Sequence, residues 1–230
     1  MMKGQILRGY GRRARSLFVK SVALVVSVAS ISAPVHAGPL ALPRLPGVRV
    51  RPGAIAPGTW VRYSIYLPKR GVTLVRMSAL GRVGKAQWFE VSLTRSRGRS
   101  LIIKTLIEGT LDRPKRVRET IVQPPGQVPL RLPAELAGKL APRFDMGKPG
   151  RAIGRETVVV PAGRFSATHF RRKRKGHVED AWLSPSVAGW PLLRYRSGKT
   201  RIELIARGTD ARSEISQTPV DFDPRLISGP

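Results

Sequence analysis

From Trp60 onwards the chain consists of short runs in which apolar and polar residues alternate, separated by glycine-containing turns. Such a period of two is typical of β-strands with one buried face. In Trp60–Leu67 and Gln87–Thr94 the apolar side chains on one side are Val61, Tyr63, Ile65, Leu67, Phe89, Val91 and Leu93. Two further runs, Val72–Leu80 and Leu101–Glu108, complete four strands. The short turns between them predict an antiparallel meander with one apolar and one polar face.

A second group of strands is predicted nearer the C-terminus. The stretch Glu156–Ser184 contains a β-branched run that is broken by Pro161 and Gly163, a basic turn around Gly176 and a returning apolar run. These breaks exclude a continuous helix and favour a β-hairpin with a charged tip. Two more short strands follow, at Pro191–Arg196 and Thr200–Arg207.

Three strings in this second group carry a resemblance. They read ETVVVPAGRFSATHFR (Glu156–Arg171), DAWLSPSVAGWPLLRY (Asp180–Tyr195) and TRIELIARG (Thr200–Gly208). The V-x-V-P-A-G-x-F corner, the W-x-S strand and the P-L strand resemble a group of secreted β-rich bacterial proteins related to periplasmic lipoprotein carriers. The resemblance covers roughly residues 58–208 and implies a half-barrel fold. It carries no catalytic role onto any residue.

One helix is predicted between the two groups of strands. Pro133–Leu140 has proline in its first turn and places Leu132, Leu136 and Leu140 on one side. Asp112–Pro125 is expected to form one more edge strand. We therefore predict a mainly β fold within residues 58–208, a single antiparallel curved sheet (half-barrel) with this short helix as a lid over the concave face.

The two ends of the chain are predicted to lie outside this domain. Residues 1–37 join a basic stretch, the apolar run Ser21–Ala33 and a small-x-small site at Val35–Ala37. This indicates a signal peptide cleaved after Ala37 and export, most simply to the periplasm; an uncleaved anchor is the alternative. Residues 38–57 are rich in proline and glycine and are expected to be mobile. Residues 209–230 are expected to form a loose tail.

The composition limits the possible chemistry. The chain has no cysteine, which excludes disulfides, thiolate metal sites and lipidation of an N-terminal cysteine. Its formal net charge of +28 suggests a polyanionic or anionic-membrane partner, although solubility or arginine usage explains it equally well. Nucleic acid is an unlikely partner, because no binding motif is present and export argues against it.

The densest charge lies in the hairpin Phe165–Leu183. Its anion-binding candidates are Arg171, Arg172, Lys173, Arg174 and Lys175. They suit phospholipid head groups or an acidic partner, and they equally suit a solvated tip that prevents edge-to-edge aggregation. The turn of Arg95, Arg97 and Arg99 has the same two interpretations, and anion contact gains weight if both turns lie at one end of the sheet.

No enzymatic chemistry is predicted. If Arg172 pairs with His177, His169 falls opposite Asp180, but no activated serine or third group accompanies them, so a structural pair is the simpler interpretation. No spacing suggests a metal site, and no cofactor is expected. Oligomeric state is not predicted.

The functional hypothesis is a non-enzymatic periplasmic binding protein that holds a lipid or a lipoprotein's acyl chain on the concave face. Its ligand-binding candidates are Val61, Tyr63, Ile65, Phe89, Val91, Leu93, Leu136 and Trp182. The four tryptophans could line such a pocket or simply belong to the core. The alternative is a structural or interaction module that docks on anionic envelope surfaces through its basic hairpin tips and has no ligand cavity.

Overall fold

The structure is a computed structural model. It describes residues 55–223 except 69, 96, 97, 99, 112, 113, 141–149, 175 and 188, with only the backbone at 138–140 and 174. The expected signal peptide and most of the segment 38–57 lie outside the described residues. Residues 55–57 of that segment are described, and Ile55 is buried.

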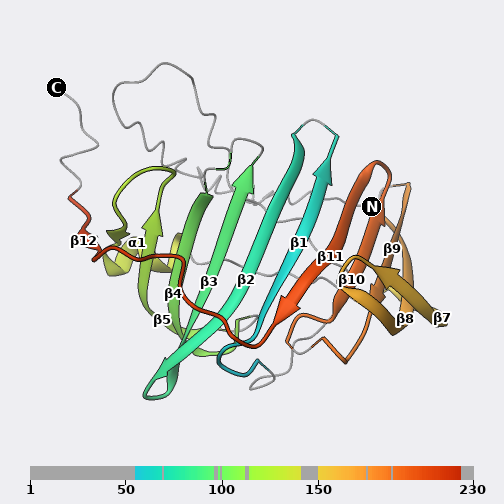
Figure 1. The fold of residues 1–230 in the computed structure, drawn as a ribbon, viewed down its shortest axis with the longest axis horizontal. Helices are drawn as coiled ribbons and strands as arrows, with labels where there is room; N and C mark the ends of the chain where they lie inside the picture. The colour runs from blue at the N-terminus through green and yellow to red at the C-terminus, as the bar shows by residue number, and fades with distance from the viewer. Residues whose placement is uncertain are drawn as a thin grey trace, which may run out of the picture.

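The described chain contains twelve strands and one helix (Figure 1). The first half comprises β1 (Trp60–Leu67), β2 (Gly71–Val83), β3 (Ala86–Arg95), β4 (Ser100–Gly109), β5 (Pro114–Gln123), β6 (Leu130–Arg131) and α1 (Ala134–Leu140). The second half comprises β7 (Arg151–Val160), β8 (Gly163–Arg174), β9 (His177–Leu183), β10 (Leu192–Ser197), β11 (Thr200–Gly208) and β12 (Val220–Asp221).

All twelve strands belong to one open sheet in the order β12-β6-β5-β4-β3-β2-β1-β11-β10-β9-β8-β7. The halves are joined where β1 pairs with β11, the first long strand with the last, so neither half forms a sheet of its own. Neighbouring strands are antiparallel except β12 and β6, which pair in parallel. The mainly β, single-sheet prediction is confirmed. β5 is not an edge strand, however, because β6 and β12 continue the sheet beyond it.

The tight turns explain why this sequence forms hairpins. Gly71 and Gly98 adopt φ angles of 69° and 72°, which side chains with a Cβ rarely adopt. The amide of Gly98 donates to the carbonyl of Arg95 and closes the β3–β4 turn. Glycine therefore sets the register of the meander, as short hairpin loops generally do.

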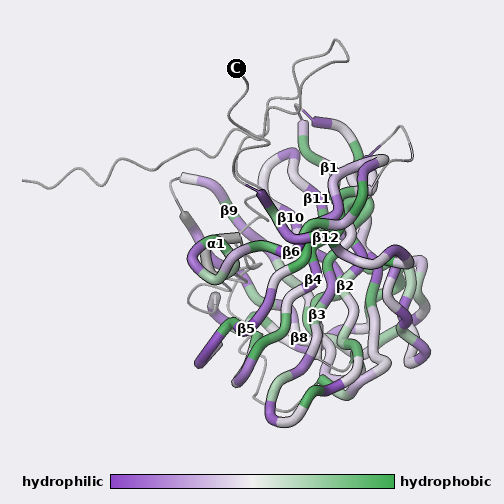
Figure 2. The backbone as a smooth tube through the Cα atoms, turned by 90° about the vertical axis from the view of Figure 1, so that its left-hand side faces the viewer, coloured by the Kyte–Doolittle hydropathy of each residue, from purple (hydrophilic) through white to green (hydrophobic). Residues whose placement is uncertain are grey.

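The strands divide their side chains between two faces, and Figure 2 shows how hydrophobic and hydrophilic residues alternate along the backbone. On the apolar face, Val61 lies opposite Met77, Met77 opposite Val91, and Val91 opposite Ile103. On the polar face, Arg62 lies opposite Arg76, and Glu90 opposite Lys104. The alternation of the sequence thus becomes one apolar face that continues across the meander.

The second half curls so that β7, its outermost strand in the sheet, returns to the middle of that half. β7 contacts β10 and β11 as well as its partner β8. Arg194 donates to the carbonyl of Val159 at 2.7 Å, and the amide of Ala162 donates to the carbonyl of Leu204 at 3.4 Å. The buried side chains Val158, Val160 and Phe165 then join the same hydrophobic cluster as β1, β10 and β11.

The helix α1 packs beside the sheet, next to β5 (Figures 1 and 2). Ala137 is 1% exposed, and its carbonyl accepts a hydrogen bond from the buried hydroxyl of Thr120 at 3.2 Å. Thr120 lies opposite Thr105, which lies opposite Phe89, so α1 sits on the apolar face. The predicted helix is present, but it lies against β5 near one side of the sheet rather than across the middle of the face.

Residues 209–219, here called the strap, cross the polar face from β11 to β12 (Figure 1). The strap starts at Gly58, whose carbonyl accepts from the amide of Ala211 at 2.7 Å. It ends where Val220 and Asp221 pair with Leu130 and Arg131. The sequence led us to expect a loose tail here. The strap is held instead by contacts with residues more than a hundred positions away, which no local pattern reveals.

Candidate functional site

The apolar face brings together most of the predicted ligand-binding residues. Val61, Tyr63 and Ile65 on β1 and Phe89 and Val91 on β3 are each 1–6% exposed and belong to one hydrophobic cluster. Leu93 lies opposite Val75 and packs against that cluster while remaining half-buried. Leu136 is half-buried on α1, beside β5. Seven of the eight predicted residues therefore belong to this face or to the helix beside it.

Tyr63 connects the apolar face of β1 to the β9–β10 connection. Its hydroxyl lies 3.1 Å from the carbonyl of Trp190 and 3.0 Å from that of Leu192, both of which it can donate to. Burial raises the pKa of this hydroxyl far above its ordinary value, so it stays a neutral donor. Tyr63 is thus a fixed structural link between the two halves of the sheet.

Trp182 packs against the edge of the hydrophobic cluster, but its ring lies among polar and charged groups. Its neighbours Ala181 and Leu183 point into the core, and the alternation of β9 directs Trp182 the other way. The indole stacks on the ring of His169 with centroids 4.4 Å apart, and its Nε1 donates to Glu156. The guanidinium of Arg196 lies 5.8 Å from the ring centroid. The environment of Trp182 is therefore polar and cationic.

The other tryptophans divide between the faces. Trp190 alone of the four is in the buried cluster. Trp60 and Trp88 lie on the polar face, where Arg76 and Lys104 sit 5.0 and 5.1 Å from their ring centroids. The sequence suggested that the tryptophans line a pocket or belong to the core. Neither describes Trp60 and Trp88, whose rings make cation–π contacts on the face that the strap crosses.

His169 and Asp180 do meet, in a different register from the one considered. Arg174 rather than Arg172 pairs with His177, so His169 lies directly opposite Trp182 and reaches Asp180 diagonally. Nε2 of His169 is 2.7 Å from Oδ1 of Asp180, and Nδ1 is 3.4 Å from Oε1 of Glu156. Every polar atom of the imidazole is therefore engaged by the protein.

The charged groups of this cluster pair with one another, which is a structural rather than a catalytic arrangement. Partial burial acts to raise the pKa of Asp180, but hydrogen bonds from Arg171 and His169 outweigh it and hold that pKa below its ordinary value. The carboxylate thus remains ionised and paired. No serine or other nucleophile joins His169 in the contacts described, and among the described residues no group of three or more His, Asp or Glu side chains is arranged to hold a metal.

The basic run of β8 is partly neutralised within the hairpin. Nε of Arg171 donates to Asp180 at 2.7 Å, and Nε of Arg172 donates to Glu179 at 2.5 Å. Lys173 is exposed. The side chain of Arg174 and all of Lys175 lie outside the description. Two of the five predicted anion-binding residues therefore already have carboxylate partners inside the protein.

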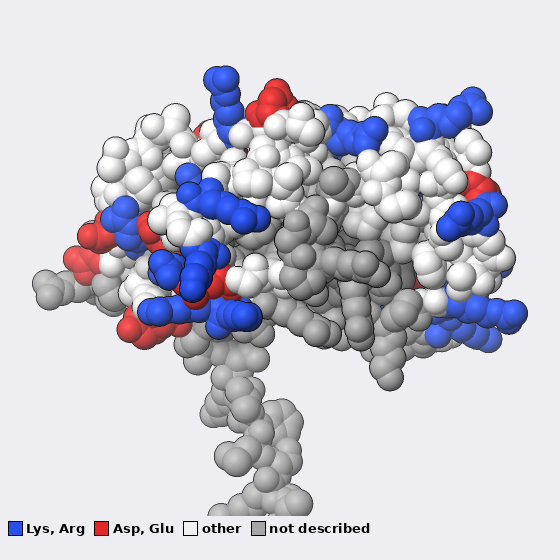
Figure 3. Space-filling model, turned by 90° about the horizontal axis from the view of Figure 1, so that it is seen from below, with Lys and Arg blue, Asp and Glu red and all other residues white. Residues whose placement is uncertain are grey.

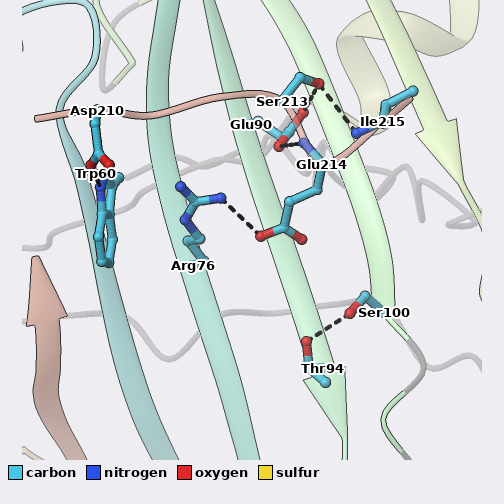
Figure 4. Close-up of polar contacts among 9 residues, drawn as sticks. All are labelled: Trp60, Arg76, Glu90, Thr94, Ser100, Asp210, Ser213, Glu214 and Ile215. Carbon is cyan, nitrogen blue, oxygen red and sulfur yellow. Dashed lines mark hydrogen bonds and ion pairs between the residues drawn. The ribbon is translucent and has the colours of Figure 1, made fainter. Parts of the chain in front are cut away.

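The most elaborate polar site was missed by the sequence reasoning (Figure 4). Glu90 is 2% exposed, and its carboxylate accepts from Oγ of Ser213 at 2.5 Å and from the amide of Glu214 at 2.9 Å. Burial raises the pKa of Glu90, while these two hydrogen bonds and the nearby ammonium of Lys104 act in the opposite direction. The only sequence signal was an acid on the polar face of a central strand.

Two further contacts attach the strap on the β1 and β2 side of Glu90 (Figure 4). Nε1 of Trp60 donates to Asp210 at 2.7 Å, which lowers the pKa of that carboxyl. Arg76 pairs with Glu214 at 3.0 Å. The strap therefore crosses β1, β2 and β3 with a polar contact on each.

The comparisons with known proteins assign no family. No family model matches the chain, and no curated protein matches it. Among solved structures, two crystal forms of PNGF-II, in space groups C2 and P21, are similar to it with TM-scores of 0.31. Sequence identities are 8% and 7%, over 74% and 71% of this chain. The chain spans about a third of the length of PNGF-II, with coverages of 31% and 32%.

Proposed function

We propose that this protein is a non-enzymatic binding protein of the bacterial periplasm that holds a lipid or a lipoprotein's acyl chain on the apolar face of its curved sheet. The observation that carries the proposal is the continuity of that face. Apolar side chains follow one another across adjacent strands of an open sheet, from Ile202 on β11 through Ile65 on β1 to Val75, Val91 and Ile103.

The energetics of such a face favour long hydrocarbon chains. Each methylene transferred from water contributes about 0.8 kcal/mol, so six to eight methylenes supply roughly 5–6 kcal/mol before the cost of ordering the chain. The lining residues Val61, Val75 and Val91 are already 1–3% exposed. A ligand must therefore displace the side chains that now cover them. The free energy of binding is then the difference between the apolar contacts made with the ligand and those lost on displacement.

The resemblance to secreted lipoprotein-carrier-like proteins supports the same assignment. Its V-x-V-P-A-G-x-F corner forms the β7–β8 turn, where Val158, Val160 and Phe165 are buried in the cluster that contains Val61 and Tyr63. The motif thus contributes to the core beside the proposed binding face. Export is part of the proposal and rests on the N-terminal sequence.

Uptake of a fluorescent fatty acid by the purified protein, together with native mass spectrometry after mild purification, tests the proposal. We expect saturable uptake and a mass increment equal to one acyl ligand. A protein that is empty in every preparation and shows no saturable uptake contradicts it.

Two leucine variants locate the binding face. Leu93 and Leu74 are both half-buried, but Leu93 lies on the apolar face opposite Val75, whereas Leu74 lies on the other face opposite Ser64. Leu93→Ala should weaken uptake by about ten-fold, the effect of losing roughly two methylene contacts. Leu74→Ala should leave uptake unchanged. Equal effects of the two substitutions would place the ligand elsewhere.

The burial of the lining side chains favours a second candidate, an interaction module whose apolar face is permanently closed. In that case the protein acts through its surface alone. Hydrogen exchange distinguishes the candidates: addition of a fatty acid should change the protection of β1 and β3 amides if the face takes a ligand, and should leave it unchanged if the face is permanently packed.

A further inference from the structure

The antiparallel order of the sheet places the basic turns at one end. Chain direction alternates from strand to strand, so the β1–β2, β3–β4, β8–β9 and β10–β11 turns all lie at the same end, the upper edge in Figure 1. We call this the basic end. Its exposed and described cations include Arg70, Arg95, Lys173, Lys199 and Arg201, one or more from each of the four turns.

Five of the connections that meet the basic end, the four basic turns and the β5–β6 connection, contain no acidic residue. The segments 66–72, 94–101, 123–130, 173–178 and 196–201 lack aspartate and glutamate altogether. The nearest carboxylates, Glu179 and Asp180, are paired with Arg172 and Arg171. Acids gather elsewhere, notably on the strap, and the view from the opposite end shows acidic and basic residues side by side (Figure 3).

The spacing of the turns suits a surface of distributed charge. Neighbouring strands lie about 4.8 Å apart, so successive turns, two strands apart in the sheet order, lie about 10 Å from one another and the row extends roughly 30 Å. That separation is close to the Debye length at physiological salt, about 8 Å. The four turns therefore act mostly as separate positive charges along one edge, and their fields add more strongly as the salt concentration falls.

Exposed apolar side chains lie among these cations. Tyr66 and Val72, directly opposite one another beside the β1–β2 turn, are 41% and 49% exposed. Val178, beside the β8–β9 turn, and Val128, in the β5–β6 connection, are similarly exposed. Cations with an exposed tyrosine and valines match the interfacial region of a bilayer, where amphipathic rings and short apolar groups are stabilised. Nucleic acid would favour stacking platforms, and one tyrosine among valines does not form one.

From this arrangement we propose that the basic end is a membrane-docking edge, which binds the surface of a bilayer containing anionic phospholipid. Cations contact the head groups, while Tyr66 and Val72 enter the interface. The sheet then stands with its strands directed at the membrane, and the strap remains free of it. This inference does not depend on ligand binding at the apolar face.

Vesicle co-sedimentation of the full chain tests the proposal. Phosphatidylglycerol-containing vesicles should bind it, pure phosphatidylcholine vesicles should bind it much more weakly, and added salt should release it. The double variant Arg95→Glu/Lys199→Glu should bind at least thirty-fold more weakly, since each basic residue near an anionic surface strengthens binding roughly five-fold. Tyr66→Ser should weaken binding by several-fold without changing its salt dependence.

The matched controls lie at the other end of the sheet. Arg82 and Lys85 are exposed at the β2–β3 turn, and Val83 is 51% exposed between them. The double variant Arg82→Glu/Lys85→Glu has the same change in net charge and keeps the same N-terminal segment. Its affinity for vesicles should be within about two-fold of that of the parent. Val83→Ser should have no effect.

Three outcomes would overturn the proposal. Equal losses in the two double variants would show that net charge alone drives binding. Unchanged binding of Arg95→Glu/Lys199→Glu would place the contact elsewhere. Salt-sensitive binding to single-stranded nucleic acid, without binding to vesicles, would assign the basic end to another partner. Far-ultraviolet circular dichroism of each variant should match the parent, because every substituted residue lies at the surface outside the buried core.

Discussion

Glu90 provides the most direct test of how the strap is held. The substitution Glu90→Ala removes the acceptor of two hydrogen bonds, from the Ser213 hydroxyl at 2.5 Å and the Glu214 amide at 2.9 Å. Lys104 also loses its opposite cross-strand charge. Because the side chain is 2% exposed, water does not readily replace these partners.

The cost of Glu90→Ala to strap attachment can be estimated from these contacts. Hydrogen bonds with a charged partner contribute about 1.5–3 kcal/mol each, and relief of the buried carboxylate's desolvation offsets part of the loss. We expect a net cost of about 2–4 kcal/mol to strap attachment. Since about 1.4 kcal/mol corresponds to a factor of ten, the strap should open roughly 30 to 1000 times more often.

Hydrogen exchange at the Glu214 amide measures this opening directly, because that amide donates to Glu90 itself. Exchange should accelerate at Glu214, while β1 and β2 retain their protection. Glu90→Gln keeps the shape and one acceptor, and should cost no more than about 1 kcal/mol. The two substitutions thus separate loss of the acceptor from loss of the charge.

Thr94→Ala is the matched control. Thr94 lies on the same face of β3, but its hydroxyl bonds to Ser100 at 2.7 Å rather than to the strap (Figure 4). Exchange at Glu214 should therefore match that of the parent. If Glu90→Ala changes this exchange by less than three-fold, or if Thr94→Ala accelerates it equally, the strap does not depend on the buried carboxylate.

Three further predictions concern pH and packing. Folding raises the pKa of Glu90, so the unfolded chain loses this proton at a lower pH than the folded chain. This group therefore lowers the free energy of unfolding as pH rises from about 4.5 through the raised pKa. Glu90→Gln should remove that component of the pH dependence, as measured by denaturant titrations at several pH values. Asp180 behaves in the opposite sense. Asp180→Asn should cost about 1–2 kcal/mol at pH 7, because the hydrogen bonds from Arg171 and His169 to the carboxylate are weakened or lost. In the same titrations this cost should shrink as pH falls below about 3.8 and disappear once pH is below the lowered pKa of Asp180. Gly58→Ala should lower the free energy of unfolding by about 2 kcal/mol or more, as measured by thermal unfolding. Gly58 has φ +87°, and an added Cβ would lie 2.4 Å from the carbonyl oxygen of Thr209. Gly84→Ala is the control and should cost less, because Gly84 also has a positive φ but open space around it.

The described part of the chain contains no helix long and apolar enough to cross a bilayer. Docking through the basic end requires none. The proposed contact is peripheral, so it should be reversed by salt, and this distinguishes it from anchoring by an apolar segment.

Much of the apolar face could be read from the sequence. The period of two in β1 and β3 assigns Val61, Tyr63, Ile65, Phe89 and Val91 to one side of their strands, because successive side chains of a strand point in opposite directions. Glycine turns made neighbouring runs antiparallel, and a proline start with a leucine stripe identified α1. These are local properties, and local sequence is sufficient to determine them.

Contacts between distant segments could not be read in this way. The diagonal contact between His169 and Asp180 depends on the register of the β8–β9 hairpin, which differs by two residues from the register assumed from the sequence. In the observed register Trp182 lies opposite His169, on the polar side of β9. The position of α1 against β5 depends on the packing of Ala137 over Thr120, which a helical stripe alone does not specify.

The sequence by itself determined which residues alternate, where the chain turns and that its charge is basic. Only the tertiary structure decided that β1 joins β11, that four basic turns share one end, and that the strap buries Glu90 against Ser213 and Glu214. The physical reason is the range of the interactions. Strand periodicity and turn chemistry act over a few residues, whereas sheet order and burial of a carboxylate depend on segments more than a hundred residues apart.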